Sequence, residues 1–487
     1  MAYTIREFES EGKFTQALAM DVFMSVLPGS LISAVLAETG RQTQRERKLN
    51  LVITVWVVIG LYLFARCSVK RVLVKLAQGV RLLWGDGEYC LAGDSALSYR
   101  RDQVGVRPLA RLCQRVCQPL ATPATPGAFQ FGLRLIALDG TVDAVADTAE
   151  NVAVFGRANS GHGVSAYPQM RGVHLVECGT HALIGSTFWP YAVGERHGAV
   201  RLLPLIQPDW LVMWDAGFHD FDLWLAVTRR QAQALAPVPS YLKPEWVQAL
   251  PDGSAWGYLR PSEPARRKAG ERLLVRVINY TLTDPALPGC GETHRLLTTL
   301  LDPERYPLLE LIDLYHTRWE FELAIDEIET HQRLTDAPLR GLHPKRVLQE
   351  AYGLVVAHYL IRSHMHAAAV ASGLAPTQLS FVHAIEIIRQ AVPEFQLVVP
   401  AQQLALTDRL WRDLAAGRLP PRRFRTAPRV IKRRVSKFLR KQPEHLHVAQ
   451  PTKSFRDCVA VLPTGAPPPE LNLWCVLDLR QPAPALI

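Results

Sequence analysis

The segment from Tyr315 to Glu329 combines an apolar stripe with a cluster of charged and aromatic side chains. Its spacing predicts an α-helix, because Tyr315, Arg318 and Glu322 are three and four residues apart and so share one face. An adjoining face carries the apolar residues Leu314, Phe321, Ile325 and Ile328. A carboxylate, a guanidinium and a phenol presented together suit a site that holds a metal ion beside a phosphate. An amphipathic helix with a solvated charged face would give the same pattern.

The charge of the chain points to a polyanionic partner. At 487 residues it has room for two to four domains, and its net charge is +10 with a pI near 9.3. The basic excess is uneven: thirteen Lys and Arg residues lie between Arg409 and Lys441, with Asp413 the only acid among them. A solvated surface explains one or two such residues, so this run predicts contact with nucleic acid.

Neither the cysteines nor the apolar segments predict a secreted or membrane protein. Eight cysteines in this length do not suggest a disulfide scaffold, and we expect reduced thiols. Cys113 and Cys117 are four apart with no second pair at zinc-ligand spacing, which favours ordinary helix residues. No signal peptide is expected, because acids are mixed into residues 5–11. The apolar run 51–65 has fifteen residues, short of the roughly 20 that span a bilayer, so we expect a buried helix.

Helical patterns at both ends of the chain flank a region with strand patterns. Residues up to about 125 have mostly helical spacing, and the Pro-rich segment 119–127 separates them from the strand patterns. Strands are expected over 129–138, 172–178, 182–188, 210–214 and 273–282. Later helices are expected over 221–235, 307–332 and 344–371.

Three carboxylates stand at positions where a helix-flanked sheet places ligands. Asp139 and Asp215 directly follow predicted strands, and Glu322 lies on the later helix. Brought together, they would repel one another unless a cation joined them, and Mg²⁺ and Mn²⁺ prefer such oxygen ligands. Two such ions, about 3.5–4 Å apart, can activate a water or a 3′-hydroxyl and stabilise a leaving oxygen.

Each of these acids also has an ordinary structural explanation. Asp139 precedes a glycine and could form a turn, with Asp143 and Asp147 as rival carboxylates nearby. Asp215 could cap the following helix. Glu322 could pair on the surface with the arginine four residues before it, which is worth only about 0.3–0.5 kcal/mol.

Taken in order, the motifs resemble a known family. The segments are Ile136-Ala-Leu-Asp-Gly-Thr141, Asp147-Thr-Ala-Glu-Asn151 with Phe155-Gly156, then Asp215-Ala-Gly-Phe218, then Tyr315, Arg318 and Glu322, and the basic run 427–434. Together they resemble a DDE transposase of the insertion-sequence-four family. The resemblance implies an α/β, ribonuclease-H-like mixed sheet flanked by helices, with a β-rich insertion, an N-terminal helical domain and a basic C-terminal region. The implied boundaries are 1–125 for a DNA-binding helical domain, 126–235 and 304–375 for the two parts of the core, 236–303 for the insertion and 376–487 for the basic region.

The resemblance also implies the chemistry. Asp139, Asp215 and Glu322 would be the catalytic ligands of two Mg²⁺ ions, for which Mn²⁺ can substitute. Tyr315 and Arg318 would hold a phosphate. The remaining DNA-binding residues would be Trp319, Arg333, Arg429, Lys432, Arg433 and Arg434. Trp319 would stack on a displaced base, although a core position beside Phe321 explains a tryptophan there equally well.

One position departs from the family pattern. The lysine expected seven residues after Glu322 is Glu329 here, which would repel a phosphate. His331 or Arg333 could supply the contact instead, or it could be missing. The leading hypothesis is a bacterial cytoplasmic, nucleoid-associated, cut-and-paste transposase that binds inverted repeats as a dimer on double-stranded DNA, with no membrane partner. The alternative is a catalytically impaired or repurposed DNA-binding relative.

Overall fold

The computed structural model describes ten segments of the chain, which group into two compact units. The described residues are 3–6, 18–42, 49–84, 91–160, 163–239, 242–284, 290–318, 320–333, 337–420 and 454–464. Unit 1 comprises Met1–Leu211 and Arg318–Pro421, and unit 2 comprises Val212–Thr317 and Arg422–Ile487. The chain therefore passes into unit 2 just before Asp215 and returns to unit 1 at Arg318. The five-part division expected from the sequence stays a prediction.

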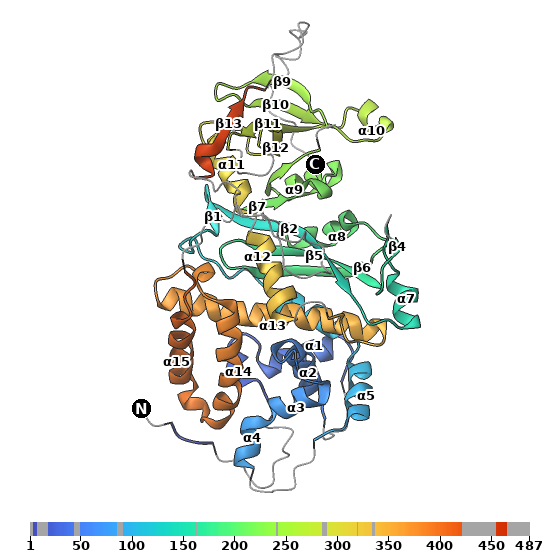
Figure 1. The fold of residues 1–487 in the computed structure, drawn as a ribbon, viewed down its shortest axis with the longest axis vertical. Helices are drawn as coiled ribbons and strands as arrows, with labels where there is room; N and C mark the ends of the chain where they lie inside the picture. The colour runs from blue at the N-terminus through green and yellow to red at the C-terminus, as the bar shows by residue number, and fades with distance from the viewer. Residues whose placement is uncertain are drawn as a thin grey trace, which may run out of the picture. The chain divides into compact units, whose positions relative to one another are not determined.

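Helices make up the N-terminal part of unit 1, as the sequence predicts (Figure 1). They are α1 (Gly29–Glu38), α2 (Leu51–Leu63), α3 (Val69–Leu76), α4 (Gln78–Leu83), α5 (Asp94–Val104) and α6 (Arg107–Val116). In α2 every residue except Val52 is buried, so the prediction of a buried helix for this apolar run is confirmed. Asn50 caps its first turn by accepting a hydrogen bond of 2.8 Å from the Ile53 amide. Among the described residues, no helix is long and apolar enough to cross a bilayer.

A long helix, α13 (Pro344–Ala371), joins the N-terminal helices to the strands of unit 1. It packs against α2, α6 and β6 (Ala182–Pro190), and Figure 1 shows it between these layers. Two further helices, α14 (Phe381–Leu397) and α15 (Gln403–Ala416), complete this part of the unit. The sequence predicted α13 with the same bounds.

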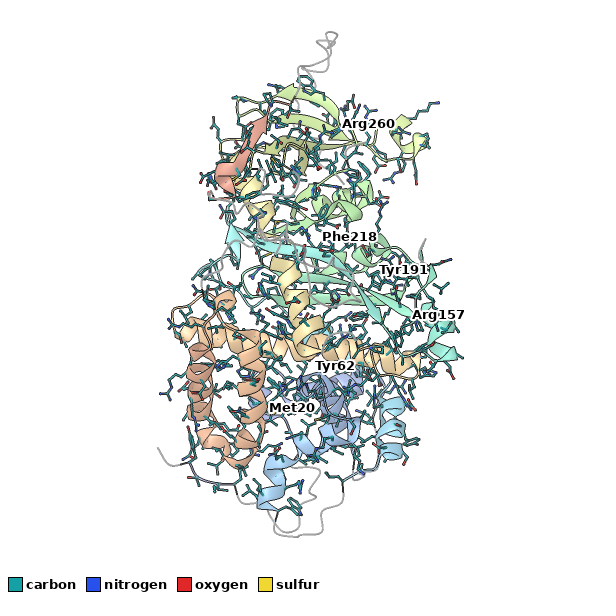
Figure 2. The ribbon with its side chains drawn as sticks, viewed as in Figure 1. Met20, Tyr62, Arg157, Tyr191, Phe218 and Arg260 are labelled. Atoms are coloured by element: carbon teal, nitrogen blue, oxygen red, sulfur yellow. The ribbon has the colours of Figure 1, made fainter. Side chains whose placement is uncertain are left out.

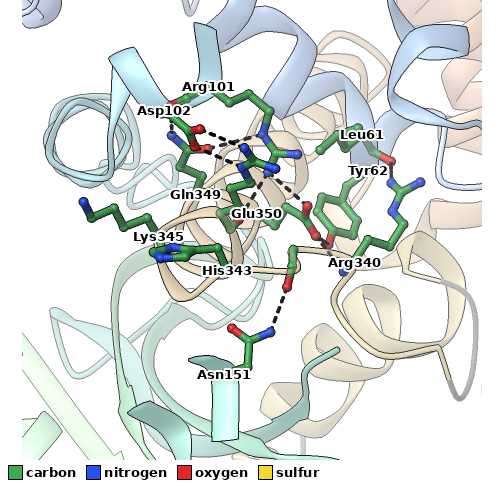
Figure 3. Close-up of polar contacts among 12 residues, drawn as sticks. Leu61, Tyr62, Arg101, Asp102, Asn151, Arg340, His343, Lys345, Gln349 and Glu350 are labelled. Atoms are coloured by element: carbon green, nitrogen blue, oxygen red, sulfur yellow. Dashed lines mark hydrogen bonds and ion pairs between the residues drawn. The ribbon is translucent and has the colours of Figure 1, made fainter. Parts of the chain in front are cut away.

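A buried carboxylate, Glu350 on α13, holds this interface together (Figure 3). Its Oε1 accepts a bond of 3.0 Å from Arg101 of α5, and its Oε2 accepts one of 3.1 Å from the Tyr62 hydroxyl of α2. The backbone amide of Arg340 donates a third bond to Oε2, at 2.8 Å. Because the three donors come from different segments, this one charge connects α2, α5 and the chain that enters α13.

The strands of unit 1 form an antiparallel meander in the order β6-β5-β2. The strands are β2 (Leu133–Ala144), β5 (Gln169–Glu177) and β6, and the two strands predicted over 172–178 and 182–188 pair with each other as the hairpin of β5 with β6. The expectation that the strand ends at Asp139-Gly140-Thr141 is wrong. β5 pairs with β2 through Ala144, where its partner is Gln169, and this pairing keeps the Asp-Gly dipeptide extended.

The turn that the sequence placed after Leu138 lies earlier in the chain. Phe131 and Gly132 have positive φ angles of 54° and 77° and connect β1 (Phe129–Gln130) to β2. Positive φ at both loop residues is typical of a β-hairpin whose loop has two residues. The segment predicted as one strand over 129–138 is therefore two paired strands. Two short helices also belong to unit 1, α7 (Ala149–Phe155) and α8 (Glu195–Leu202).

The described part of unit 2 is built mainly from strands. Strand β7 (Trp210–Trp214) leads into it, and the next strands form an antiparallel series in the order β8-β12-β11-β10-β9. These strands are β8 (Gln233–Pro237), β9 (Glu245–Ala249), β10 (Ala255–Leu259), β11 (Leu273–Leu282) and β12 (His294–Thr298). The predicted helix 221–235 is too long, since α9 ends at Arg229 and Gln231 has a φ of 60°. The other helices of unit 2 are α10 (Pro264–Lys268) and α11 (Leu308–Thr317).

Candidate active site

Asp139 lies in the middle of β2, half-buried, opposite His174 of β5. Its Oδ1 accepts a hydrogen bond of 2.7 Å from the amide of Gly140, which fixes the carboxylate. Its Oδ2 accepts a bond of 2.9 Å from Nη1 of Arg318. The side chains of this ion pair are only 19% and 16% exposed, so a cation already neutralises the Asp139 carboxylate in a poorly hydrated setting.

Glu322 lies on the short helix α12 (Glu320–Asp326), which packs against β2. Its side chain is exposed. The structure thus places two of the three predicted carboxylates, Asp139 and Glu322, on neighbouring elements of unit 1. Arg318 forms its ion pair with Asp139, and not the surface pair with Glu322 that the spacing allowed.

Asp215 and Tyr315 lie in unit 2, at the end of β7. Asp215 caps a short helical turn, η4 (Ala216–Phe218): its Oδ1 accepts bonds from the amides of Gly217 at 2.9 Å and Phe218 at 3.3 Å. Phe218, labelled in Figure 2, is fully buried and anchors this turn. The capping role foreseen for Asp215 is therefore real, but both bonds use Oδ1, so capping does not occupy Oδ2. The grouping of Asp215 with the other two carboxylates stays a prediction.

Tyr315 on α11 reaches the strand that precedes Asp215. Its hydroxyl makes a long hydrogen bond, 3.5 Å, to the carbonyl of Trp214, the last residue of β7. The ring is half-buried. Unit 2 thereby brings the predicted phosphate-binding tyrosine to the end of the strand that Asp215 follows.

The helix predicted over 307–332 is interrupted in the structure. α11 ends at Thr317, Arg318 lies in a turn, α12 begins at Glu320, and a π-helical segment, η5 (Glu327–Gln332), continues from it. Thr317 contributes to the end of α11, because its hydroxyl bonds back to the Leu314 carbonyl at 2.7 Å. Tyr315 and Glu322 therefore do not share the face of one uninterrupted helix.

The rival carboxylates are engaged in ion pairs of their own. Asp143 accepts a hydrogen bond from Arg333, and the two side chains are 10% and 12% exposed. Asp147 pairs with Arg157 at the surface. Arg333 was predicted to contact DNA, but its pairing with Asp143 favours a role in holding η5 to the end of β2. Glu329, at the position of the missing lysine, is exposed on η5.

Several predicted DNA-binding residues lie outside the described part of the chain. These are Trp319, Arg429, Lys432, Arg433 and Arg434. Their roles stay predictions. Cys113 and Cys117, by contrast, are buried in and next to α6 with their sulfurs 3.8 Å apart, as ordinary helix-associated thiols.

Residues 454–464, which follow the basic run in the sequence, form a segment that packs against β11 and α11 and that the sequence did not predict. Its strand β13 (Val459–Leu462) pairs with β11. Phe455 stacks on His316 of α11, with ring centres 3.9 Å apart and planes 8° apart, and Arg456 lies 3.5 Å from Asp313. Burial lowers the pKa of His316 below its ordinary value, which keeps the stacked ring neutral near pH 7. The only sequence signal was the short apolar run 459–462.

Two family models match the chain. One, described as "Transposase DDE domain", matches residues 130–360, which include β2, β7 and α12. The other, "Insertion element 4 transposase N-terminal", matches residues 17–114 and so the N-terminal helices. These two matches place the chain in the class of the DDE transposases.

Individual relatives agree with these models. The chain is 29% identical over 422 residues to "Transposase InsG for insertion sequence element IS4" of Escherichia coli strain K12, covering 85% of this chain and 92% of that protein. It is 27% identical over 212 residues to "Putative transposase InsZ" of the same organism, covering 43% and 68%. The chain belongs to the IS4 family of DDE transposases, which makes it a DNA transposase and confirms the ribonuclease-H-like fold that the resemblance implied.

A solved structure is also similar in part. It is the cryo-EM structure of a piggyBac transposase synaptic complex with hairpin DNA, with a TM-score of 0.40 and 12% identity over 81% of this chain and 84% of that one.

Proposed function

We propose that this transposase binds the inverted repeats at its transposon ends, cleaves them by metal-dependent phosphodiester hydrolysis and joins the freed 3′-hydroxyls to target DNA. The observation that carries the proposal is the placement of Asp139 and Glu322 on packed elements, β2 and α12, inside the region matched by the DDE-domain model. Asp215 follows β7 in the family's order and supplies the third carboxylate.

The same three residues would hold the metal. Asp139 fits this role because its Oδ2 already faces a cation, Arg318, and it sits where little water competes. Carboxylate oxygens are the ligands that Mg²⁺ and Mn²⁺ prefer, and neither His nor Cys belongs to the set. Two bound ions would supply an activated water or hydroxyl and stabilise the leaving oxygen. With the metal in place, the Asp139 carboxylate would have a second cationic neighbour, which would free Arg318 to donate to a DNA phosphate.

The remaining proposed contacts are with DNA. Tyr315 and Arg318 would grip a phosphate at the transposon end, and Trp319 would stack on a base there. The basic run, with Arg429, Lys432, Arg433 and Arg434, would follow the DNA backbone together with the N-terminal helical domain. Both ends must be held at once, so we expect at least a dimer on DNA. The relatives are bacterial, and we place the activity at the nucleoid in the cytoplasm.

The test is the replacement of each carboxylate by alanine. D139A, D215A and E322A should bind a transposon-end duplex as the wild type does, because none of the three residues belongs to the basic run. Each should lose cleavage at any Mg²⁺ concentration. A D215A protein that still cuts its transposon end would remove Asp215 from the metal site.

The second candidate is a DNA-binding relative with impaired strand joining. Glu329 motivates it, because this exposed carboxylate stands where the family has a lysine. A strand-transfer assay with precleaved ends separates the two. No joined product at any Mg²⁺ or Mn²⁺ concentration would favour this candidate. If the wild type joins the ends and E329K only increases the rate of joining, the active enzyme is favoured.

A further inference from the structure

The helix that carries Glu322 does not end at Asp326 but continues into a π-helical turn. This turn, η5, begins at Glu327. A π-helical turn has more residues per turn than an α-helix, so its side chains are rotated relative to those of α12. Such turns are rare in proteins overall, but those that occur are often found at functional sites. The result is a carboxylate facing inward: Glu327 is 8% exposed, whereas Glu329 on the same turn is exposed.

The Glu327 carboxylate is held by three side chains from two other elements. Its Oε1 lies 2.9 Å from Nδ1 of His181, in the turn between β5 and β6. Its Oε2 lies 3.1 Å from Nε2 of His358 and accepts a bond of 2.8 Å from Nε of Arg362, both on α13. Arg362 Nη2 bonds Oε1 as well, so the arginine contacts both carboxylate oxygens. Burial opposes the charge, yet Arg362 and His181 hold the pKa of Glu327 well below its ordinary value.

The partners of Glu327 are themselves fixed and buried. His358 and Arg362 are 0% and 1% exposed, and His181 is 1% exposed with a positive φ of 59°, a conformation that few side chains adopt. Among the described residues, His358 Nδ1 and Arg362 Nη1 have no hydrogen-bond partner. An apolar core of the same shape would avoid these unsatisfied groups, so stability alone does not account for the cluster.

The cluster lies close to the proposed metal ligand on the same run of helix. Glu327 comes five residues after Glu322, about 7.5 Å along the helix axis, at the end of α12 where the helix meets α13. Four contacts on one carboxylate fix both the rotation of the helix and its axial position. α12 packs against β2, which carries Asp139, so a rotation of α12 would change where Glu322 points relative to that aspartate.

We infer that Glu327, held by Arg362, His358 and His181, is a positioning residue that sets Glu322 in register with Asp139 for metal binding. The inference rests on the proposed function of Glu322 and Asp139 as metal ligands. Glu327 itself does not touch the metal or the DNA. Residues that orient metal ligands from behind typically change metal affinity by about 10–100-fold when altered.

The experiment compares Glu327→Gln with Glu329→Gln in the full-length protein bound to a transposon-end duplex. The two changes remove the same charge from the same π-helical turn, one buried and one exposed. Mn²⁺ binding is followed directly by electron paramagnetic resonance, DNA affinity by gel shift and folding by circular dichroism. E327Q should bind Mn²⁺ about 10–100-fold more weakly while it binds DNA within about twofold of the wild type, and E329Q should keep the Mn²⁺ affinity of the wild type.

Folded E327Q with wild-type Mn²⁺ affinity would overturn the inference, and so would an equal loss in E329Q. If E327Q does not fold, His358→Gln removes one of the four contacts and should weaken Mn²⁺ binding in the same direction. Unchanged binding in H358Q would also overturn it. E322Q separates the two proposals: if E322Q keeps wild-type Mn²⁺ binding, the proposed function fails, whereas loss in E322Q without loss in E327Q removes only the positioning role.

Discussion

Replacing Glu350 by alanine should destabilise the protein far more than removing any surface ion pair at the same interface. The Glu350 side chain is 1% exposed and accepts three hydrogen bonds, from Arg101, Tyr62 and the Arg340 amide. In E350A the Arg101 guanidinium, only 6% exposed, would lose its counter-charge inside the protein. Breaking a buried pair in this way costs about 3–5 kcal/mol.

The size of the effect can be measured by thermal unfolding. For a large domain each kcal/mol shifts Tm by roughly 2 °C, so E350A should lower Tm by about 6–10 °C. The variant keeps the apolar contacts of α13 with α2 and so should still fold at low temperature. Circular dichroism at pH 7, combined with a urea titration in the cold, gives both Tm and the free energy of unfolding.

A matched control lies on the same two helices. Asp102 of α5 pairs with Arg346 of α13 at 2.8 Å, but the side chains are 54% and 25% exposed. An exposed pair is worth about 0.2–1 kcal/mol, so D102A should lower Tm by no more than about 2 °C. Equal losses in E350A and D102A would refute the reasoning that burial decides what each charge contributes.

Three further changes test other parts of the structure. Arg318→Ala should reduce single-turnover DNA cleavage by about 10²–10³-fold, because the cation proposed to grip the phosphate at the transposon end is lost, and unchanged cleavage would argue against its role. Phe455→Ala should cost about 0.5–1.5 kcal/mol in urea unfolding, because the stack on His316 is lost, and no change would mean that the docked segment does not stabilise α11. Burial lowers the pKa of His364 from 6.5 to about 4, so only the unfolded chain takes up this proton between those values. Stability should therefore fall by up to about 1.4 kcal/mol per pH unit as the pH drops from 6.5 to 4, and His364→Gln should flatten this slope in urea titrations.

Elements defined by their own local pattern could be predicted from the sequence. β7, β11 and α13 have the bounds that were expected, because each is a run of apolar or periodic residues whose neighbours end it. The buried α2 followed from its length and composition. The order of the carboxylates along the chain was likewise visible, since each motif is local.

Features that depend on distant partners could not be predicted. β2 continues past Asp139 because β5 pairs with it, and nothing next to the Asp-Gly dipeptide reveals that pairing. Arg318 bonds an aspartate 179 positions away rather than the glutamate four residues on. The ion pair of Arg333 with Asp143 is another contact between residues far apart in the sequence, and the sequence around Arg333 does not reveal it.

The inward rotation of Glu327 was hidden for the same reason. Its acidic neighbours Asp326 and Glu329 are exposed, and in the sequence all three look alike. Its partners distinguish it: Arg362 and His358 on α13, and His181 in the turn between β5 and β6. The docked segment after the basic run was also missed, because four apolar residues do not by themselves specify a strand.

The proposed mechanism depends on Asp139, Asp215 and Glu322 forming one metal site on DNA. The most direct test counts Mn²⁺ ions bound per protomer in complexes with a transposon-end duplex, for the wild type and for D139N, D215N and E322Q. We predict two ions in the wild type and fewer in each variant, with DNA affinity retained. Two ions bound with wild-type affinity in D215N would contradict a shared three-carboxylate site.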